Sequence, residues 1–296
     1  MSRTAFVGLG AMGSGMAANL ARHGEVAAFD IVAPALEAAA RAGCRPAGSV
    51  AEAVADADVV ITMLPAAAHV REAWVSQVIP AAKSGALLID CSTIDVETAR
   101  EVALGARQAG LRAADAPVSG GTMAAEAGTL AFMVGCEDAD LIAVKAALEP
   151  MARTIIHAGG PGAGQAAKIC NTMLLGISML GTCEAFALAE KLGLAADRFF
   201  EVASSSSGQC WSLTSYCPWP GPVAAAPSNR GYEGGFLTRL MSKDLKLAQE
   251  AASRAGATTP LGAQAQALYA LFEGLGYGQK DFSAVLQLMR GRLGEL

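Results

Sequence analysis

The first residues that could do chemistry form a glycine-rich turn near the start of the chain. Gly8, Gly10 and Gly13 fit the pattern GxGxxG, with an apolar run before them and a helical run after them. A second apolar run ends in Asp30, 22 residues after Gly8. The first glycine of such a turn permits a tight bend, the second lets a pyrophosphate approach, and the third lets helix and strand pack closely. The pattern predicts a dinucleotide site made of Gly8, Leu9, Gly10, Ala11, Met12, Gly13 and Asp30.

The acid at position 30 bears on the choice of dinucleotide. A carboxylate accepts hydrogen bonds from a ribose 2′-hydroxyl and repels a 2′-phosphate, so Asp30 predicts NAD rather than NADP. The alternative is a tight strand–helix turn that binds nothing. Strand, turn, helix and acid in the right order favour the dinucleotide.

A lysine and an asparagine are the candidate catalytic residues. Lys168 and Asn171 lie three positions apart after a glycine-rich loop, so both fall on one face of the predicted helix. A lysine near apolar walls and a helix N-terminus is expected to have a lowered pKa and to exchange a proton with a hydroxyl or carbonyl oxygen. By spacing alone, a surface lysine that covers apolar neighbours with its stem is the more common case.

Further candidates lie where predicted strands end. Ser119, Gly120 and Gly121 follow one strand, and adjacent glycines leave backbone N–H groups open to a small carboxylate. Leu64 and Pro65 end another strand, and Ser92 and Thr93 a third. Ligands of open parallel sheets collect at this edge. The alternatives are a flexible loop, an ordinary strand–turn junction and helix capping, respectively.

The elements that must position these residues alternate in the first half of the chain. This alternation predicts a Rossmann-like, doubly wound α/β fold with a mostly parallel sheet. The expected strands are Thr4–Leu9, Glu25–Phe29, Val59–Leu64, Ala86–Asp90, Leu111–Asp115, Thr129–Val134 and Thr154–Ala158. Expected helices between them include Ala11–Arg22, Pro34–Ala42 and Val96–Ala109.

The second half of the chain has only helical patterns. A long helix from about Gln165 past Lys191 is apolar on nearly all sides and is expected to be a buried spine. Further helices are expected at Ala196–Ser204, Leu240–Ala255, Leu261–Leu271 and Ser283–Gly291, with a long ordered loop over 217–235. The expected domains are a dinucleotide-binding domain over 1–162 and an all-helical substrate and oligomerisation domain over 163–296.

Composition limits the class of protein. The chain has 296 residues, a net charge of −5 and 53% hydrophobic residues. The negative charge argues against nucleic-acid and anionic-membrane partners, and the apolar composition favours subunit contacts. The seven cysteines form no CxxC pair and the three histidines lie far apart, so no metal or disulfide framework is expected. We expect a cytoplasmic protein, with no leader before the first strand and an apolar stretch at Thr172–Cys183 too short to span a membrane.

Together these motifs resemble the β-hydroxyacid dehydrogenases over essentially the whole chain. The matching segments are Phe6–Gly13, Asp115–Gly121, Gly162–Asn171 and Lys243-Asp244-Leu245. The segments Ile89–Ile94, Ala167–Asn171, Tyr216–Gly221 and Tyr232–Phe236 are most similar to the branch that acts on 3-hydroxyisobutyrate.

The resemblance implies a role for each matching residue. Lys168 is the general acid/base, Asn171 supports it or the substrate, and Ser119, Gly120 and Gly121 hold the substrate carboxylate. Leu64, Pro65, Thr93 and Lys243 line the cofactor site. The implied reaction is oxidation of 3-hydroxyisobutyrate to methylmalonate semialdehyde, a step of valine breakdown, in a homodimer or homotetramer.

Three alternatives stay open at this level. A sister enzyme would act on tartronate semialdehyde, succinic semialdehyde, 3-hydroxypropionate or L-serine. A 6-phosphogluconate dehydrogenase would need a basic phosphate site and a longer helical domain. A non-catalytic dinucleotide-binding module would not need the lysine that this chain retains.

Overall fold

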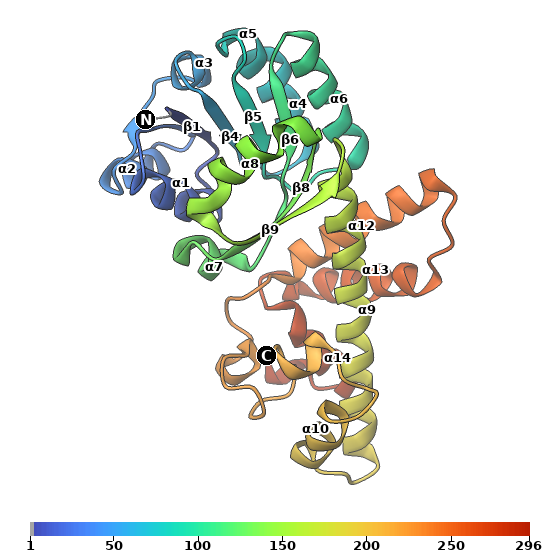
Figure 1. Ribbon diagram of the computed structural model, residues 1–296. Coiled ribbons are helices and arrows are strands. Elements are labelled where there is room, and N and C mark those ends of the chain that lie inside the picture. The colour runs from blue at the N-terminus through green and yellow to red at the C-terminus, as the bar shows by residue number, and fades with distance from the viewer. Residues whose placement is uncertain (1–2) are drawn as a thin grey trace. The chain divides into compact units, whose positions relative to one another are not determined.

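The computed structural model describes residues 3–296 and divides into two compact units, Met1–Lys168 and Ile169–Leu296. The first unit is built on a nine-stranded sheet with helices on both sides (Figure 1). Its strands are β1 (Thr4–Val7), β2 (Val26–Phe29), β3 (Arg45–Pro46), β4 (Val59–Thr62), β5 (Leu87–Asp90), β6 (Arg112–Asp115), β7 (Val118–Ser119), β8 (Leu130–Cys136) and β9 (Ala152–Gly159).

Six strands of this sheet run parallel in the order β3-β2-β1-β4-β5-β6, which is the order of a dinucleotide-binding Rossmann fold. Strand β8 lies antiparallel to β6 and β7, and β9 is parallel to β8. The mostly parallel sheet expected from the sequence is confirmed, and the two-residue strands β3 and β7 are additions to it. The carboxyl ends of the parallel strands share one edge, where the predicted cofactor residues lie.

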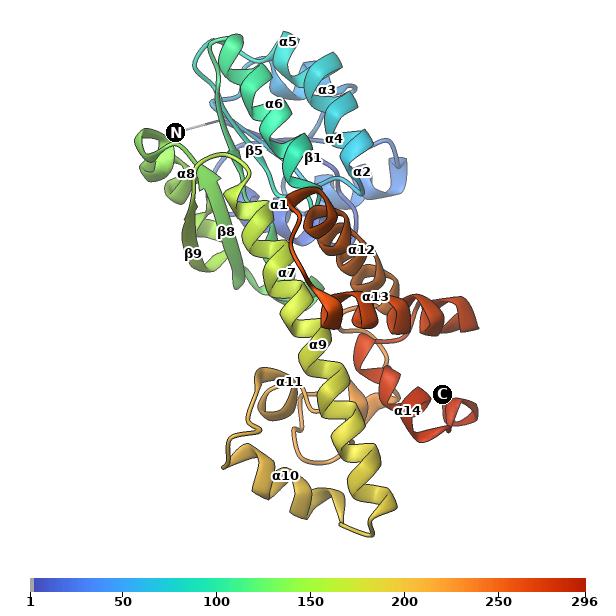
Figure 2. The same cartoon turned by 90° about the vertical axis from the view of Figure 1, so that its right-hand side faces the viewer.

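The helices of the first unit cover both faces of this sheet. They are α1 (Gly13–Ala21), α2 (Ala33–Arg41), α3 (Val50–Val54), α4 (Ala67–Ala73), α5 (Ile79–Ala81), α6 (Val96–Gln108), α7 (Gly121–Ala127) and α8 (Leu141–Leu148). Figure 2 shows α3, α4 and α6 on one side and α8 on the other. Successive strand residues point to opposite faces, so Phe6 packs with Met16 of α1 while Val7 packs with Val54 of α3.

The second unit is helical and begins within α9 (Ala163–Lys191). The other helices are α10 (Ala196–Ser204), α11 (Trp211–Thr214), α12 (Thr238–Ala255), α13 (Pro260–Phe272) and α14 (Val285–Arg290). Gly176 of α9 lies against α12, because a Cβ there would be 3.1 Å from Leu245. Tyr269 and Phe282 are fully buried in the core of this unit.

The expectation that α9 is buried on nearly all sides is wrong. Its 29 residues satisfy the length and hydropathy requirements of a membrane span, but 39% of the most apolar window is buried inside the protein. The side chains of Leu174 and Leu188, on a face of α9 that the rest of the chain does not cover, are 63% and 59% exposed. The core helix of a soluble protein meets the same requirements. The apolar pattern of the sequence did not show which face of α9 is buried and which is exposed.

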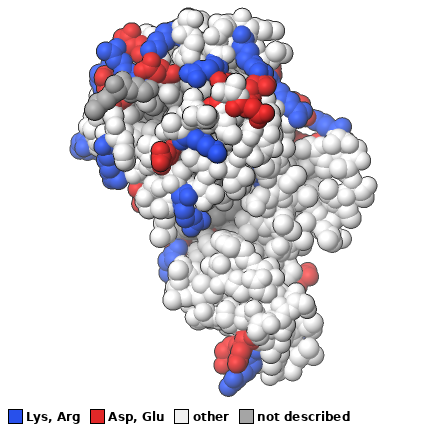
Figure 3. Space-filling model, viewed as in Figure 1, with Lys and Arg blue, Asp and Glu red and all other residues white. Residues whose placement is uncertain are grey.

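The loop over 217–235 is ordered, as expected. Ser228 donates to the Cys217 carbonyl at 2.8 Å, and Tyr232 donates to the Pro218 carbonyl at 2.8 Å. Trp219 stacks on Phe186 and lies under the Arg290 guanidinium, so it is a packing anchor. On the face shown in Figure 3, acidic and basic side chains are interspersed over the sheet unit, and most of the helical unit is uncharged.

Candidate active site

The glycine turn between β1 and α1 has the geometry that a pyrophosphate needs. Gly8 has a φ of +99°, and a Cβ there would lie 2.3 Å from the Met63 carbonyl oxygen. A Cβ at Gly13 would lie 1.9 Å from the Gly8 carbonyl oxygen, so neither position admits another residue without a shift. A Cβ at Gly10 would meet nothing within 4 Å. Open space over Gly10, beside the start of α1, fits a phosphate group.

Asp30 lies just beyond β2 and is tied to the glycine turn. Its carboxylate accepts hydrogen bonds from the backbone N–H of Leu9 at 2.5 Å and of Val32 at 2.8 Å. A carboxylate has about four lone-pair sites, so two such bonds leave capacity for ribose hydroxyls. The next two residues, Ile31 and Val32, are apolar and 91% and 52% exposed.

A buried polar network joins the ends of β4 and β5. The Asp90 carboxylate accepts hydrogen bonds from the Thr62 hydroxyl at 2.7 Å and the Ser92 hydroxyl at 2.6 Å. The Ser92 oxygen in turn accepts from the Leu64 N–H at 2.8 Å. The Trp74 indole donates to Thr62 at 3.0 Å. The network therefore fixes Leu64, one of the predicted cofactor residues, against the segment that contains Thr93.

The carboxyl group of Asp90 is buried, which disfavours its charged form. Burial raises its pKa from 3.8 to about 6, and the nearby Asp115 carboxylate adds to the shift. Its second oxygen, Oδ2, is buried without a hydrogen-bond partner among the residues that the structure describes.

Asp115, at the end of β6, anchors the first turn of α9. One carboxylate oxygen accepts from the Gly162 N–H at 2.6 Å and the other from the Gln165 N–H at 2.8 Å. The helix approaches the sheet very closely, because a Cβ on Gly164 would lie 2.3 Å from the Met133 carbonyl oxygen. Burial nevertheless raises the pKa of Asp115 to about 6. The helix that carries Lys168 is thus held at its start by strands β6 and β8.

The structure places the candidate catalytic residues on helices. Lys168 is 7% exposed and is the last residue of the first unit, so a solvent-exposed lysine is excluded. Asn171 lies three residues further along α9, within the second unit, and is exposed. Lys243 lies on α12 of the second unit, before the buried Asp244.

The predicted carboxylate-binding segment lies between β7 and α7. Gly120 has a φ of +132° and Gly121 of +70°, conformations that favour glycine at both positions. Ser119 is half-buried and pairs with Ala131 of β8, so the segment continues from the end of the sheet.

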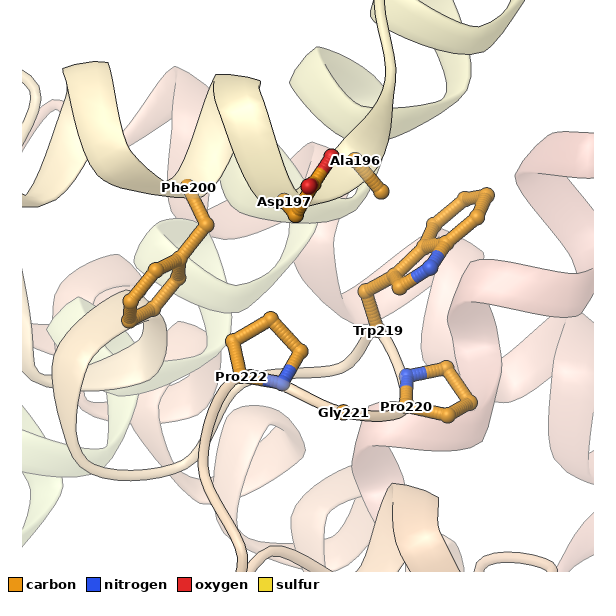
Figure 4. Close-up of a pocket in the computed structure, with 7 residues that line it drawn as sticks. All are labelled: Ala196, Asp197, Phe200, Trp219, Pro220, Gly221 and Pro222. Atoms are coloured by element: carbon orange, nitrogen blue, oxygen red, sulfur yellow. The ribbon is translucent and has the colours of Figure 1, made fainter.

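A separate cavity of about 580 Å³ lies in the helical unit (Figure 4). It is open and mostly apolar, and it contains none of the residues predicted to bind cofactor or substrate. Its lining consists of Ala196, Asp197, Phe200, Trp219, Pro220, Gly221 and Pro222. Over residues 3–296, no three His, Cys, Asp or Glu side chains gather as a metal site would require.

Two family models together match nearly the whole chain. Residues 3–160 match the NAD-binding domain of 6-phosphogluconate dehydrogenase, and residues 162–289 match the NAD-binding domain of NADP-dependent 3-hydroxyisobutyrate dehydrogenase. The probable 3-hydroxyisobutyrate dehydrogenase of Mycobacterium tuberculosis H37Rv is 48% identical over 293 residues, covering 99% of each chain.

The chain belongs to the β-hydroxyacid dehydrogenase family.

Other members of this family are similar over the same length. The 3-hydroxyisobutyrate dehydrogenase of Pseudomonas aeruginosa is 47% identical, covering 99% of this chain and 100% of the relative. The NAD-dependent L-serine dehydrogenase of the same organism is 46% identical, covering 97% and 98%. A solved structure of the M. tuberculosis 3-hydroxyisobutyrate dehydrogenase with L-serine has a TM-score of 0.95 at 48% identity, covering 98% of this chain and 99% of that one.

As a β-hydroxyacid dehydrogenase, the protein is an oxidoreductase that acts on small 3-hydroxyacids with NAD(P). The glycine turn, the open space over Gly10 and the carboxylate of Asp30 fit this cofactor.

Sequence reasoning missed the structural roles of three residues that shape this site, although two of them, Asp115 and Gln165, lie inside segments that resemble the family. Asp115 and Gln165 hold the start of α9, and Asn19 of α1 donates to the Ala125 carbonyl at 2.7 Å near the end of α7. An acid at a strand end before a proline was a signal for Asp115. Gln165 and Asn19 form no pattern in the sequence, because the backbone groups that their side-chain amides contact near this site lie 71 or more residues away.

Proposed function

We propose that this enzyme catalyses the NAD-dependent oxidation of 3-hydroxyisobutyrate to methylmalonate semialdehyde, the reaction of valine breakdown. The observation that carries the proposal is the burial of Lys168 on a helix whose first turn is hydrogen-bonded to Asp115. Two relatives that are 47% and 48% identical over their full length and are named for this substrate support it.

The proposed roles follow the family motifs, residue by residue. Ser119, Gly120 and Gly121 hold the substrate carboxylate through a hydroxyl and backbone N–H groups. The uncharged amine of Lys168 takes the hydroxyl proton as the carbinol carbon gives up its hydride, and returns the proton in the reverse direction. Asn171 supports Lys168 or the substrate oxygen. The bound nicotinamide supplies the hydride acceptor.

The proposed cofactor site consists mainly of short segments that follow the carboxyl ends of the parallel strands β1, β2, β4 and β5. Asp30 favours NAD, because a 2′-phosphate would meet its carboxylate and the two residues after it are apolar. The proposed contacts are Gly8, Leu9, Gly10, Ala11, Met12, Gly13, Asp30, Leu64, Pro65, Thr93 and, from the second unit, Lys243.

L-serine is the second candidate substrate. It has a carboxylate and a primary alcohol at the same spacing as 3-hydroxyisobutyrate, with an ammonium group in place of the methyl group. The relative named L-serine dehydrogenase is 46% identical, and the solved structure at 48% identity is described with L-serine.

NADH formation with purified protein tests both candidates. The panel is 3-hydroxyisobutyrate, L-serine, 3-hydroxypropionate and glycerate, each with NAD and with NADP. We expect the highest kcat/KM with 3-hydroxyisobutyrate and NAD. A lead for L-serine would move the protein to the sister branch, and no turnover with any acid would contradict the proposal.

We also propose that the enzyme is a cytoplasmic homodimer or homotetramer. Cys170, Leu174, Gly181 and Leu188 form an exposed row along α9 at spacings of four and seven residues, with the exposed Glu184 beside it. Such a row falls on one face of a helix and favours a second copy as its cover.

A further inference from the structure

The side chain of Gln165 connects the catalytic helix to the loop after β5. Gln165 lies in the first turn of α9 and is fully buried. Its amide nitrogen donates to the Ser92 carbonyl at 2.7 Å, and its amide oxygen accepts from the Ile94 N–H at 3.2 Å. The two bonds flank Thr93, so one planar amide fixes the backbone on both sides of that residue.

The same loop is held from its other side. The Ser92 hydroxyl donates to Asp90 at 2.6 Å and accepts from the Leu64 N–H at 2.8 Å. Ser92 therefore lies between α9 and the segment after β4. Leu64 and Thr93 are both proposed to contact the cofactor. The segment of Thr93 is connected to α9 through the Gln165 side chain, and Leu64 is connected through the side chains of Ser92 and Gln165.

The helix has little freedom to move without breaking these bonds. The Asp115 carboxylate binds the N–H groups of Gly162 and Gln165, which fixes the height and rotation of the first turn. Lys168 follows Gln165 by three residues, which places it next to Gln165 on the same side of the helix. A slip or rotation of α9 that moved Lys168 would therefore have to break the two hydrogen bonds of the Gln165 side-chain amide.

We propose that Gln165 is a positioning residue, which fixes Lys168 relative to the Thr93 segment and thereby sets the distance between the proton acceptor and the cofactor. The inference rests on the proposed function, because it takes Lys168 as the proton acceptor. An apolar side chain of similar size would fill the same volume but would not fix this register, and a misplacement of about 1 Å can cost on the order of a hundredfold in rate.

The first test is Gln165→Met, matched by Gln108→Met. Gln108 is exposed at the end of α6 in the same unit, so its loss removes no buried hydrogen bond. We expect Gln165→Met to lower kcat by about tenfold or more, with the KM for the hydroxyacid and the Kd for NAD changed by less than about threefold. The control should match the wild type.

The second test is Gln165→Glu over a range of pH, matched by Gln108→Glu. A protonated glutamic acid can donate to Ser92 and accept from Ile94, as the amide does, whereas a carboxylate would face the Ser92 carbonyl. The ratio of kcat for Gln165→Glu to kcat for wild type should rise at least about threefold as the pH falls from 9 to 6. The ratio for Gln108→Glu should stay flat.

Hydrogen exchange tests the hydrogen bonds of Gln165 to Ser92 and Ile94 independently of enzyme activity. In Gln165→Met, exchange over residues 92–95 should become faster, while exchange in the central strand β4 should stay unchanged. Faster exchange with an unchanged kcat would overturn the positioning role, as would an unchanged exchange rate. A loss of kcat equal to the loss of NAD affinity would assign Gln165 to cofactor binding instead.

The proposed function can fail separately from this inference. It fails if the wild type oxidises none of the hydroxyacids, or if Lys168→Ala retains the wild-type rate. The positioning role fails if the wild type is active, Lys168→Ala is not, and Gln165→Met keeps kcat within about twofold of wild type.

Discussion

At the scale of single residues, burial decides which side chains can act. Lys168 is nearly inaccessible at 7% exposure, whereas Lys145 of α8 has the same side chain and is exposed to solvent. Asp90 and Asp115 have pKa values raised to about 6 by burial, so both lie close to titration near neutral pH. The sequence could nominate these residues, but their burial depends on the packed chain.

Replacing the proposed acid/base tests the chemistry most directly. Lys168→Ala should lower turnover by about a hundredfold or more, because the hydroxyl proton loses its acceptor. The affinity for NAD, measured by fluorescence titration, should stay nearly unchanged. Lys145→Ala is the control and should keep the wild-type rate. Turnover retained in Lys168→Ala would contradict the assignment.

The role of Asp30 can be measured as a ratio. Asp30→Ala should lower the preference for NAD over NADP, expressed as the ratio of kcat/KM values, by about tenfold or more, because the repulsion of the 2′-phosphate is removed. Asp30→Asn keeps one acceptor oxygen for the Leu9 N–H and separates the effect of charge from that of turn geometry. An unchanged ratio in both variants would show that Asp30 does not select the cofactor.

The buried charge of Asp90 should give a measurable pH dependence of stability. Because its folded pKa of about 6 exceeds the ordinary 3.8, the folded state binds the proton more tightly than the unfolded chain does. This contribution to the free energy of unfolding is complete below about pH 4 and is lost as the pH rises through 6.

Asp90→Asn has no such titration. In urea titrations, the free energy of unfolding of Asp90→Asn minus that of the wild type should therefore increase by up to about 3 kcal/mol as the pH rises from 4 to 7. Asp56→Asn, at a side chain 84% exposed, is the control. The same pH dependence in both variants would exclude Asp90 as its source.

At the scale of elements, close backbone approaches determine where the helices lie. Helix α1 follows the glycine turn and packs against α7, which follows the Ser119–Gly121 segment. A Cβ on Gly15 of α1 would lie 2.9 Å from the Ala125 carbonyl carbon of α7. Asn19, one turn later, donates to carbonyls near the end of α7 at 2.7 and 3.2 Å. The helix of the cofactor turn and that of the carboxylate segment are thus packed without a gap.

Gly15→Ala should therefore destabilise the first unit by about 1–3 kcal/mol, because the new methyl group meets backbone that must shift. Gly105→Ala is the matched control, since Gly105 is also helical and its Cβ would meet Ile79 at an ordinary 3.7 Å. There the gain in helix propensity should stabilise by up to about 1 kcal/mol. Thermal unfolding that ranks the two variants in the opposite order would contradict the close packing of α1 on α7.

At the scale of the whole molecule, the main question is why large apolar side chains of α9, such as Leu174 and Leu188, are exposed to solvent in a single chain. Charged side chains are interspersed over the sheet unit, whereas the face of the helical unit in Figure 3 is largely uncharged. A helical face with few charged side chains is typical of subunit interfaces.

Light scattering during gel filtration tests this expectation. The wild type should have a mass of at least twice the 30.0 kDa of one chain. Leu174→Glu combined with Leu188→Glu should lower that mass, because two charges would be buried without partners. Ile142→Glu, at an 83% exposed position of α8, should leave it unchanged. A wild-type mass of one chain would contradict the oligomer.

The sequence by itself determined the dinucleotide turn, the alternation of strands and helices, and the helical second half, because glycine patterns and apolar periodicity are local properties of the chain. It also nominated Lys168, Asp30 and the Ser119–Gly121 segment. Only the tertiary structure decided that Lys168 is buried, that Asp115 and Gln165 hold its helix, and that one face of α9 is exposed. These contacts join residues 47 to 73 positions apart, and no local pattern encodes a hydrogen bond at that separation.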